Sequence, residues 1–123
     1  MSLTRRAALP LLGGLAAACS PLRAFNSVVP KDGGVRQVAK GLAYGEDPRQ
    51  ALDAYAPPGD GKTLVVFVYG GSWSSGRRQD YAWATRALAA QGFVTATPDY
   101  RLVPDVRFPA FVEDVAAGGT EYP

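Results

Sequence analysis

The chain has 123 residues, with 13 lysines and arginines against 11 aspartates and glutamates, one cysteine and no histidine. Without an imidazole and with a single thiol, these residues alone cannot build a catalytic triad with a histidine base, a zinc site of several cysteines and histidines, or a disulfide. The hydrophobic share of 47% and charged share of 20% are those of an ordinary globular domain, and a net charge of +2 is too small to suggest a nucleic-acid partner.

The first eighteen residues resemble a secretory signal. Arg5 and Arg6 form a basic start, similar to the paired arginines of the twin-arginine signal, and residues 7–18 are an apolar run too short to span a bilayer. We therefore expect a signal peptide over residues 1–18 and an exported protein, periplasmic or membrane-anchored in a bacterium. The stretch before Cys19 also resembles a lipoprotein signal, in which this thiol becomes lipidated. The alternative is ordinary cleavage beside an incidental cysteine, or an uncleaved start.

Residues 19–37 show no periodicity and contain several prolines and glycines, which predicts a tether without regular structure. The domain is expected over residues 38–117. It begins with two segments of alternating polarity, 38–44 and 51–55, with a Gly-Glu-Asp-Pro turn between them. This pattern predicts an antiparallel hairpin.

A different pattern follows at residues 63–69, where β-branched and aromatic residues run without polar alternation. This is typical of a strand buried on both faces of a parallel sheet. A loop rich in glycine and serine follows at residues 70–76. An amphipathic helix is then predicted from an N-cap at Asp80 to a stop at Gly92, and residues 93–97 form another strand. Together these elements predict a β-loop-α-β unit with parallel strands.

A last helix is predicted to begin at Pro109, which suits a first helical turn, and to end at Gly118 and Gly119. Residues 118–123 are expected to be a divergent tail. The predicted fold class is therefore α/β: an antiparallel hairpin, then the β-loop-α-β unit with parallel strands, then a helix.

The glycine-rich loop is where chemistry is expected, because a loop between a buried strand and a helix can point backbone N–H groups at an anion. Gly71 and Gly76 have the spacing of a phosphate-binding loop. However, Arg77 and Arg78 stand where lysine and serine or threonine are needed, and Trp73 would crowd a phosphate. The other hypothesis is an oxyanion hole, in which the amides stabilise negative charge on a substrate carbonyl oxygen.

Three blocks of sequence resemble a known family. Residues 69–76, Tyr-Gly-Gly-Ser-Trp-Ser-Ser-Gly, are similar to the His-Gly-Gly-Gly-Trp segment of α/β-hydrolases in the esterase and lipase branch related to hormone-sensitive lipase. Residues 99–104, Asp-Tyr-Arg-Leu-Val-Pro, and the Phe-Pro-Ala and Glu-Asp of residues 108–114 resemble the stretches that follow in that branch. The resemblance covers about residues 38–117. It implies the N-terminal part of an α/β-hydrolase sheet and, as substrates, small-molecule carboxylic esters.

The resemblance also implies roles for single residues in the loop. Gly70, Gly71 and Ser72 would supply the oxyanion amides, unless the glycines merely form a connecting turn. Tyr69 and Trp73 would anchor the loop. Tyr69 stands in place of the family's usual histidine, and a phenol can hold the loop through a hydrogen bond.

The charged residues near the loop are expected to be structural. The resemblance implies an ion pair among Asp99, Arg101 and Asp114 that ties the segment after the fourth strand to its neighbours, without acid–base chemistry. Arg77 and Arg78 are expected to form a solvated rim. Neither a metal nor a cofactor is expected.

In the family the nucleophile lies on a later G-x-S-x-G elbow, and the acid and histidine follow it. No such motif occurs in this sequence. The resemblance stops at about Ala117, so we expect a truncated member that lacks the C-terminal half and the triad and is inactive alone. The strand at 64–69 would then be an exposed edge prone to self-association. Two alternatives stay open: a half-enzyme completed by a second chain, and a non-catalytic exported lipoprotein or binding module.

Overall fold

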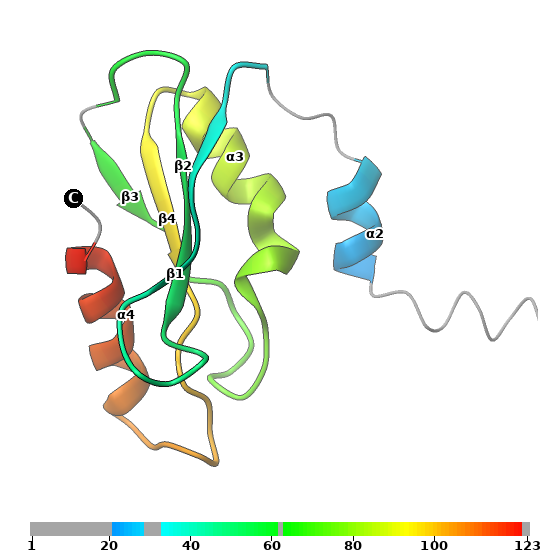
Figure 1. Ribbon diagram of the computed structural model, residues 1–123. Coiled ribbons are helices and arrows are strands. Elements are labelled where there is room, and N and C mark those ends of the chain that lie inside the picture. Colours follow the sequence, from blue (N-terminus) through cyan, green and yellow to red (C-terminus); the bar gives the residue numbers. More distant parts are fainter. Residues whose placement is uncertain (1–20, 29–32, 62, 122–123) are drawn as a thin grey trace, which may run out of the picture.

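The fold is built on a four-stranded mixed sheet with helices packed against it (Figure 1). A computed structural model describes residues 21–28, 33–61 and 63–121, and the predicted signal peptide and Cys19 lie outside these ranges. Within them, none of the helices combines the length and the hydropathy that crossing a membrane requires.

The strands are β1 (Arg36–Ala43), β2 (Ala51–Ala56), β3 (Leu64–Val66) and β4 (Val94–Pro98), in the spatial order β1-β2-β4-β3. β1 and β2 pair antiparallel, which confirms the predicted hairpin. β3 and β4 pair parallel, as the β-loop-α-β unit requires. β2 also pairs antiparallel with β4, so the hairpin and the parallel pair form one sheet. The α/β fold class is therefore confirmed.

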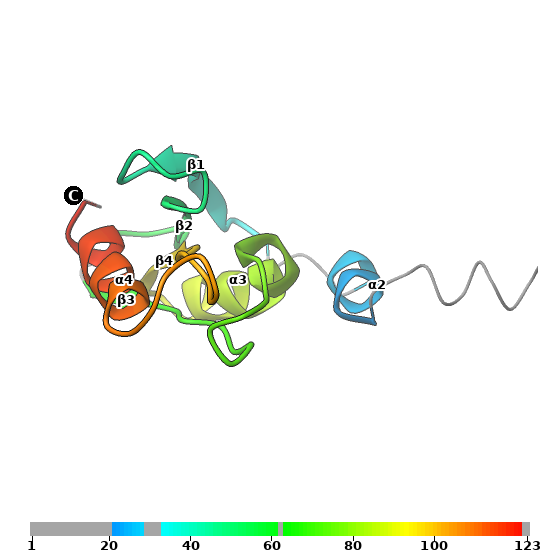
Figure 2. The same ribbon diagram turned by 90° about the horizontal axis from the view of Figure 1, so that it is seen from below.

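The helices are α2 (Pro21–Val28), the 3₁₀ helix η1 (Arg78–Tyr81), α3 (Ala82–Ala90) and α4 (Ala110–Glu121). α3 and α4 lie on opposite faces of the sheet (Figures 1 and 2). Because side chains alternate between the two faces along β4, residues of this strand contact both helices. The Thr95 hydroxyl donates to the Thr85 carbonyl oxygen of α3 at 3.0 Å. Pro98, three residues later, faces Gly118 of α4. The central strand β4 is thus covered from both sides.

In the described ranges, two apolar clusters form the core. One lies within the sheet and contains the buried side chains of Leu52, Ala54 and Ala96. The other lies past the ends of β3 and β4, where the rings of Tyr69, Tyr100 and Phe111 are buried together. Because Tyr69 immediately precedes the glycine-rich loop, this second cluster positions the candidate site.

The segment 63–69 is not a strand buried on both faces, as its apolar run predicts. The strand covers only Leu64–Val66, and the Phe67 N–H adds one further hydrogen bond to β4 at 2.8 Å. β3 lies at the edge of the sheet with a single partner strand, so the Leu64 side chain remains 38% exposed. The predicted exposed edge is therefore present at β3, although Tyr69 beyond it is buried.

The prediction that the last helix ends at Gly118 and Gly119 is wrong, because α4 runs through both residues. A Cβ at Gly118 would lie 2.9 Å from Pro98 Cβ, and one at Gly119 would lie 3.3 Å from Val66 Cγ2. The two glycines thus let the helix lie close to the sheet. Most of the tail predicted for residues 118–123 belongs to this helix.

The tether predicted for residues 19–37 also contains regular structure, since it includes α2 and the start of β1. α2 packs beside α3. Asn26 Nδ2 donates to the Gln79 carbonyl oxygen at 3.1 Å, and the Phe25 ring meets the Trp83 ring edge-on with centroids 5.1 Å apart. A helix this short needs such tertiary contacts to be stable, and these contacts cannot be predicted from the local sequence.

The start of α3 differs from the prediction, whereas its end agrees. Asp80 does not cap the helix: it lies in η1 and accepts a hydrogen bond from Arg77 Nη2 at 3.1 Å. The N-cap residue is Tyr81, which makes no side-chain cap. At the other end, Gly92 has φ +102° and follows the C-cap, as expected of a helix stop.

Candidate functional site

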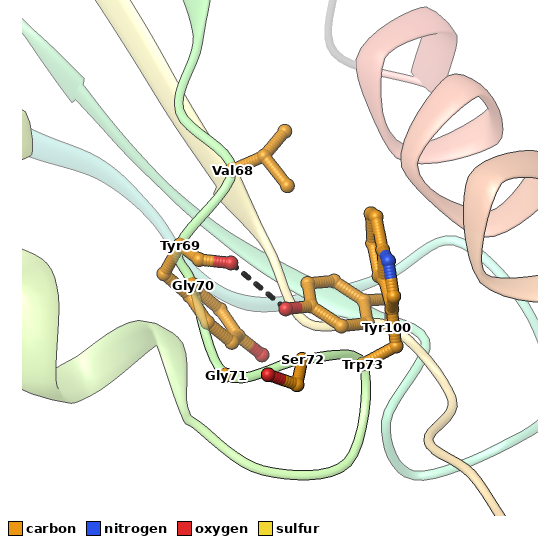
Figure 3. Close-up of a pocket in the computed structure, with 7 residues that line it drawn as sticks. All are labelled: Val68, Tyr69, Gly70, Gly71, Ser72, Trp73 and Tyr100. Carbon is orange, nitrogen blue, oxygen red and sulfur yellow. Dashed lines mark hydrogen bonds between the residues drawn. The ribbon is translucent and has the colours of Figure 1, made fainter.

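The candidate site is the loop of residues 70–77, which connects the end of β3 to η1 (Figure 3). Its starting point is fixed by Tyr69, whose ring stacks on those of Tyr81 and Tyr100 with centroids 5.3 and 5.0 Å apart. The Tyr100 hydroxyl donates to the Tyr69 carbonyl oxygen at 2.8 Å, as Figure 3 shows. The loop therefore leaves from a rigid aromatic cluster.

Tyr69 stands at the position where the family that the sequence resembles has a histidine. Its hydroxyl donates a hydrogen bond to Asp99 Oδ1 and accepts one from Arg49 Nη2 at 3.0 Å. Burial, and then the neighbouring Asp99 carboxylate, raise the pKa of the Tyr69 hydroxyl well above its ordinary value of 10. The phenol therefore remains a hydrogen-bond donor.

Three consecutive residues of the loop have positive φ: Gly71 at +147°, Ser72 at +53° and Trp73 at +60°. For residues with side chains this region costs roughly 1–3 kcal/mol each, so surrounding contacts must hold the conformation. The Gly71 carbonyl oxygen accepts the N–H groups of Ser74 and Ser75 at 3.0 and 3.1 Å, and both hydroxyls as well. These bonds close the loop into a tight turn.

The tight turn leaves backbone donors unused. Within the described part of the chain, none of the four N–H groups of residues 70–73 has a hydrogen-bond partner. The same residues line a cavity of about 290 Å³ together with Val68, Tyr69 and Tyr100 (Figure 3). Adjacent unpaired N–H groups beside a cavity can together bind a negatively charged oxygen.

Trp73 fixes the far side of this turn. Its indole stacks on the Phe111 ring of α4 with centroids 4.5 Å apart and meets the Tyr100 ring edge-on at 5.0 Å. Its carbonyl oxygen accepts the Val103 N–H at 2.9 Å. Trp73 thus both packs against α4 and forms an apolar wall of the cavity.

The predicted ion pair among Asp99, Arg101 and Asp114 is wrong for Asp99. This buried carboxylate pairs with Arg78, which contacts it through Nη1 and through its backbone N–H at 2.8 Å. The Asp99 side chain is directed toward η1, whereas Arg101, two residues later, reaches Asp114 on α4. The charges after β4 therefore divide into two separate groups.

The expectation of a solvated rim is wrong for Arg78. Its side chain is 13% exposed and lies between two carboxylates, with Nε 2.8 Å from Asp53 Oδ1 and Nη1 on Asp99. Burial alone would lower the pKa of Arg78, but the hydrogen bonds to Asp53 and Asp99 outweigh it and raise the pKa. Arg77 is 43% exposed and pairs with Asp80 at 3.1 Å. Neighbours in sequence thus have opposite surroundings.

Arg101 and Asp114 form an ion pair with two side-chain contacts of 2.9 Å each, and Gln50 Nε2 donates to Asp114 at 3.0 Å. Burial alone would raise the pKa of Asp114. The hydrogen bonds from Arg101 and Gln50 outweigh this effect, and the pKa is lowered from its ordinary value of 3.8. The pair joins the segment after β4 to α4.

We expect Asp114→Asn to make the fold less sensitive to acid. A carboxylate with a lowered pKa stabilises the folded state above its unfolded-state pKa, and this contribution is lost as the pH falls through the folded-state pKa. The free energy of unfolding in urea should therefore fall between about pH 5 and pH 2 more steeply in the wild type than in this variant. Glu113→Gln, at the exposed neighbouring position, should keep the wild-type slope. An equal change in both variants would contradict the role of the pair.

Two residues near the loop, Asp53 and Arg49, were not identified from the sequence. Asp53 stands in an otherwise apolar strand, Ala-Leu-Asp-Ala-Tyr, which is a signal for a buried charge that needs a partner. Arg49 follows an Asp-Pro turn, and nothing in the sequence distinguishes it from a surface arginine.

Among the residues that the structure describes, no nucleophile at the site has a base beside it. The hydroxyls of Ser74 and Ser75 both donate to the Gly71 carbonyl oxygen, and the sequence contains no histidine. Over the described ranges, no three acidic, cysteine or histidine side chains are grouped so that they could hold a metal ion. The arrangement can stabilise a negatively charged oxygen.

Solved structures that are similar to this chain include esterases. Esterase B from Lactobacillus rhamnosis is similar with a TM-score of 0.72 and 25% identity, over 89% of this chain and 36% of that chain. A hormone-sensitive lipase from a metagenome library gives a TM-score of 0.62 and 27% identity, over 89% and 39%. The fold and the loop therefore define the N-terminal portion of an α/β-hydrolase of the esterase and lipase branch.

Curated relatives lead to the same class. A probable isoprenylcysteine alpha-carbonyl methylesterase of Oryza sativa subsp. japonica is 38% identical over 85 residues, which are 68% of this chain and 20% of that protein. Esterase LipC of Mycobacterium tuberculosis is 43% identical over 79 residues, 60% and 19% respectively. The chain thus spans about a fifth of the length of these relatives. The family model BD-FAE matches residues 52–118, more than half of the chain, and the chain belongs to this family.

Proposed function

We propose that the chain carries the oxyanion-binding loop of a carboxylic ester hydrolase, in which Gly70, Gly71 and Ser72 donate their N–H groups to the carbonyl oxygen of a small-molecule ester. The observation that carries this proposal is the run of unpaired N–H groups at residues 70–73 beside a cavity. Such donors bind more strongly as the carbonyl oxygen becomes an oxyanion, and this difference lowers the barrier. The esterase relatives support the class of substrate.

The cavity walls favour this use of the loop. Val68, Trp73 and Tyr100 present apolar surface beside the N–H groups. An apolar wall keeps water away from a developing charge, and each hydrogen bond to that charge is stronger where the surroundings are less polar. The loop and its walls thus supply charge stabilisation.

Making and breaking the ester bond needs groups that these 123 residues do not contain. The sequence has neither a histidine nor a G-x-S-x-G elbow. We therefore propose that the chain alone does not hydrolyse esters. Turnover would require a serine nucleophile and an imidazole base from outside these residues.

Hydrogen exchange with and without sodium butyrate tests the proposed function, because a carboxylate presents an anionic oxygen to the loop. The N–H groups of residues 70–73 should exchange at least about twofold more slowly in butyrate than in sodium chloride of equal ionic strength, while those of α3 stay unchanged. In the same preparation, p-nitrophenyl butyrate should be hydrolysed at the uncatalysed rate. Unchanged exchange in the loop, or measurable ester turnover, would contradict the proposal.

We also propose that the chain self-associates through the free edge of β3. The two outer strands of the sheet differ in how they are protected. β1 carries Arg36 and Lys40 and two register shifts, all of which discourage edge pairing. β3 is uncharged, and Leu64 and nearby Val68 are 38% and 41% exposed. Pairing of two copies would give each β3 a second partner strand.

Leu64→Lys should shift the protein toward the monomer in size-exclusion chromatography with light scattering, because it places a charge on this edge. Val38→Lys is the matched control, since Val38 is similarly exposed, at 43%, but lies on β1. This control should leave the assembly unchanged. A monomeric wild type, or equal effects of the two substitutions, would contradict the proposal.

We further propose that residues 1–18 direct export and that Cys19 becomes a lipidated N-terminus, on the basis of the basic start and the apolar run of the sequence. Mass spectrometry of the protein expressed in a bacterium should show loss of residues 1–18 and an acyl addition that Cys19→Ser removes. A product that retains Met1 would contradict this proposal.

A further inference from the structure

Arg49 reaches the candidate site from the turn between β1 and β2. The turn holds its backbone in place: Asp47 Oδ1 accepts the Arg49 N–H at 2.8 Å, and the Asp47 carbonyl oxygen accepts the Gln50 N–H at 2.8 Å. Gln50 Oε1 in turn accepts the Asp47 N–H at 3.1 Å. The Arg49 side chain therefore extends from a well-bonded support outside the loop.

The Arg49 guanidinium contacts both ends of the loop. Nη2 donates to the Tyr69 hydroxyl at 3.0 Å and to the Gly76 carbonyl oxygen at 2.8 Å, and Nε donates to the Tyr100 carbonyl oxygen at 2.8 Å. The two ends also touch directly, since a Cβ at Gly76 would lie 2.7 Å from the Tyr69 ring. One nitrogen atom of a residue outside the loop thus bridges Tyr69, just before the loop, and Gly76, near its end.

An ion pair with Asp99 does not account for the position of Arg49. Arg49 Nη2 lies 3.9 Å from Asp99 Oδ1, and Arg78 already supplies this carboxylate with a charged partner. In the described part of the chain, the Arg49 side chain donates its hydrogen bonds to neutral oxygen atoms of Tyr69, Gly76 and Tyr100. A planar guanidinium suits this task because it presents several donors in fixed directions.

We propose that Arg49 is a positioning residue of the oxyanion loop, which holds Tyr69 and Gly76 at the separation that keeps the N–H groups of residues 70–73 free. The inference rests on the proposed function, since these are the groups that would bind the oxyanion. Ser72 and Trp73 have positive φ, so the loop conformation is costly and depends on the contacts that hold it, including those at its ends. Without Arg49 the loop would sample other conformations, in which the four N–H groups no longer lie together.

Arg49→Gln tests the proposal, with hydrogen exchange measured by mass spectrometry on the full chain. In a peptide that covers residues 69–76, the Ser74 and Ser75 N–H groups, which bond to the Gly71 carbonyl oxygen, should exchange at least about fivefold faster than in the wild type, and butyrate should no longer slow exchange in the peptide. Arg86→Gln is the matched control, because Arg86 lies on α3, 5.3 Å from the centroid of the Tyr55 ring. This control should keep wild-type exchange in residues 69–76, even if its free energy of unfolding falls by as much as that of R49Q.

Arg49→Lys gives a second measurement, which also serves should the glutamine variant not fold. A single ammonium can replace Nη2 at Tyr69 and Gly76 but cannot also reach Tyr100, so loop exchange should be faster than in the wild type and slower than in R49Q. Wild-type exchange in the variants of Arg49, or an equal effect of R86Q, would overturn the proposal.

The same data separate this inference from the proposed function. If butyrate fails to slow exchange in the wild type while R49Q still speeds it, the proposed function fails and the positioning role stands. If butyrate slows exchange equally in the wild type and in R49Q, the proposed function stands and the positioning role fails.

Discussion

Gly71→Ala should abolish the slowing of hydrogen exchange by butyrate at residues 70–73. A Cβ at this position would lie 2.1 Å from the Ser75 carbonyl oxygen, and the residue has φ +147°. To relieve the clash and the unfavourable φ, residue 71 must move away from Ser75. This movement breaks the hydrogen bonds from the Ser74 and Ser75 N–H groups to its carbonyl oxygen, and the turn opens. The free energy of unfolding in urea should also fall by roughly 1–3 kcal/mol.

Gly92→Ala is the control for this prediction. Gly92 also has positive φ, +102°, but a Cβ there would meet nothing within 4 Å, and the residue follows α3 on another part of the chain. Its substitution should cost roughly 1 kcal/mol for the backbone conformation and leave the butyrate effect intact. If both variants lost the butyrate effect, or neither did, the shape of the turn would not be what binds the anion.

Arg78→Met should lower the free energy of unfolding by roughly 3–5 kcal/mol. The substitution preserves the bulk of the side chain and removes the charge that lies between Asp53 and Asp99. Those two side chains are 8% and 7% exposed, so each carboxylate would lose its closest charged partner without gaining water. Urea denaturation followed by circular dichroism measures the loss, and a variant that does not fold agrees with it.

Arg77→Met is the matched control, since it makes the same change one residue earlier. Arg77 is 43% exposed, and its pair with Asp80 is largely solvated, so the free energy of unfolding should change by no more than about 0.5 kcal/mol. Equal losses in the two variants would show that the buried ion pairs of Arg78 contribute no more to stability than the exposed pair of Arg77.

The pairing of β1 with β2 and of β3 with β4 could be predicted because it depends on local pattern. Alternation at residues 38–44 and 51–55 indicates strands with unlike faces, and the apolar run at 63–69 indicates a strand of a parallel sheet. The ion pairs of Arg78 with Asp53 and Asp99 could not be predicted in this way. Arg78 meets carboxylates 25 and 21 residues away along the chain, and no local pattern states which arginine faces which carboxylate.

The place of the loop could be predicted from its glycines, but its conformation could not. Ser72 and Trp73 adopt positive φ, which is not expected of residues with side chains, and contacts with Tyr100 and Phe111 hold Trp73 there. The glycine pair in α4 shows the same limit. A helix stop and a close approach to the sheet both call for glycine, and only the positions of Pro98 and Val66 in the fold distinguish them.

Tyr69 gives the loop a property that an imidazole at the same position would lack. A histidine titrates near pH 6.5, so its charge, and with it its bond to Asp99, would change in mildly acidic solution. The Tyr69 hydroxyl, with its pKa raised by burial and by Asp99, carries its proton from acidic to alkaline conditions. The donor of the hydrogen bond to Asp99 therefore keeps a constant charge over the pH range in which an imidazole would gain one, so mild acid adds no charge at the start of the loop.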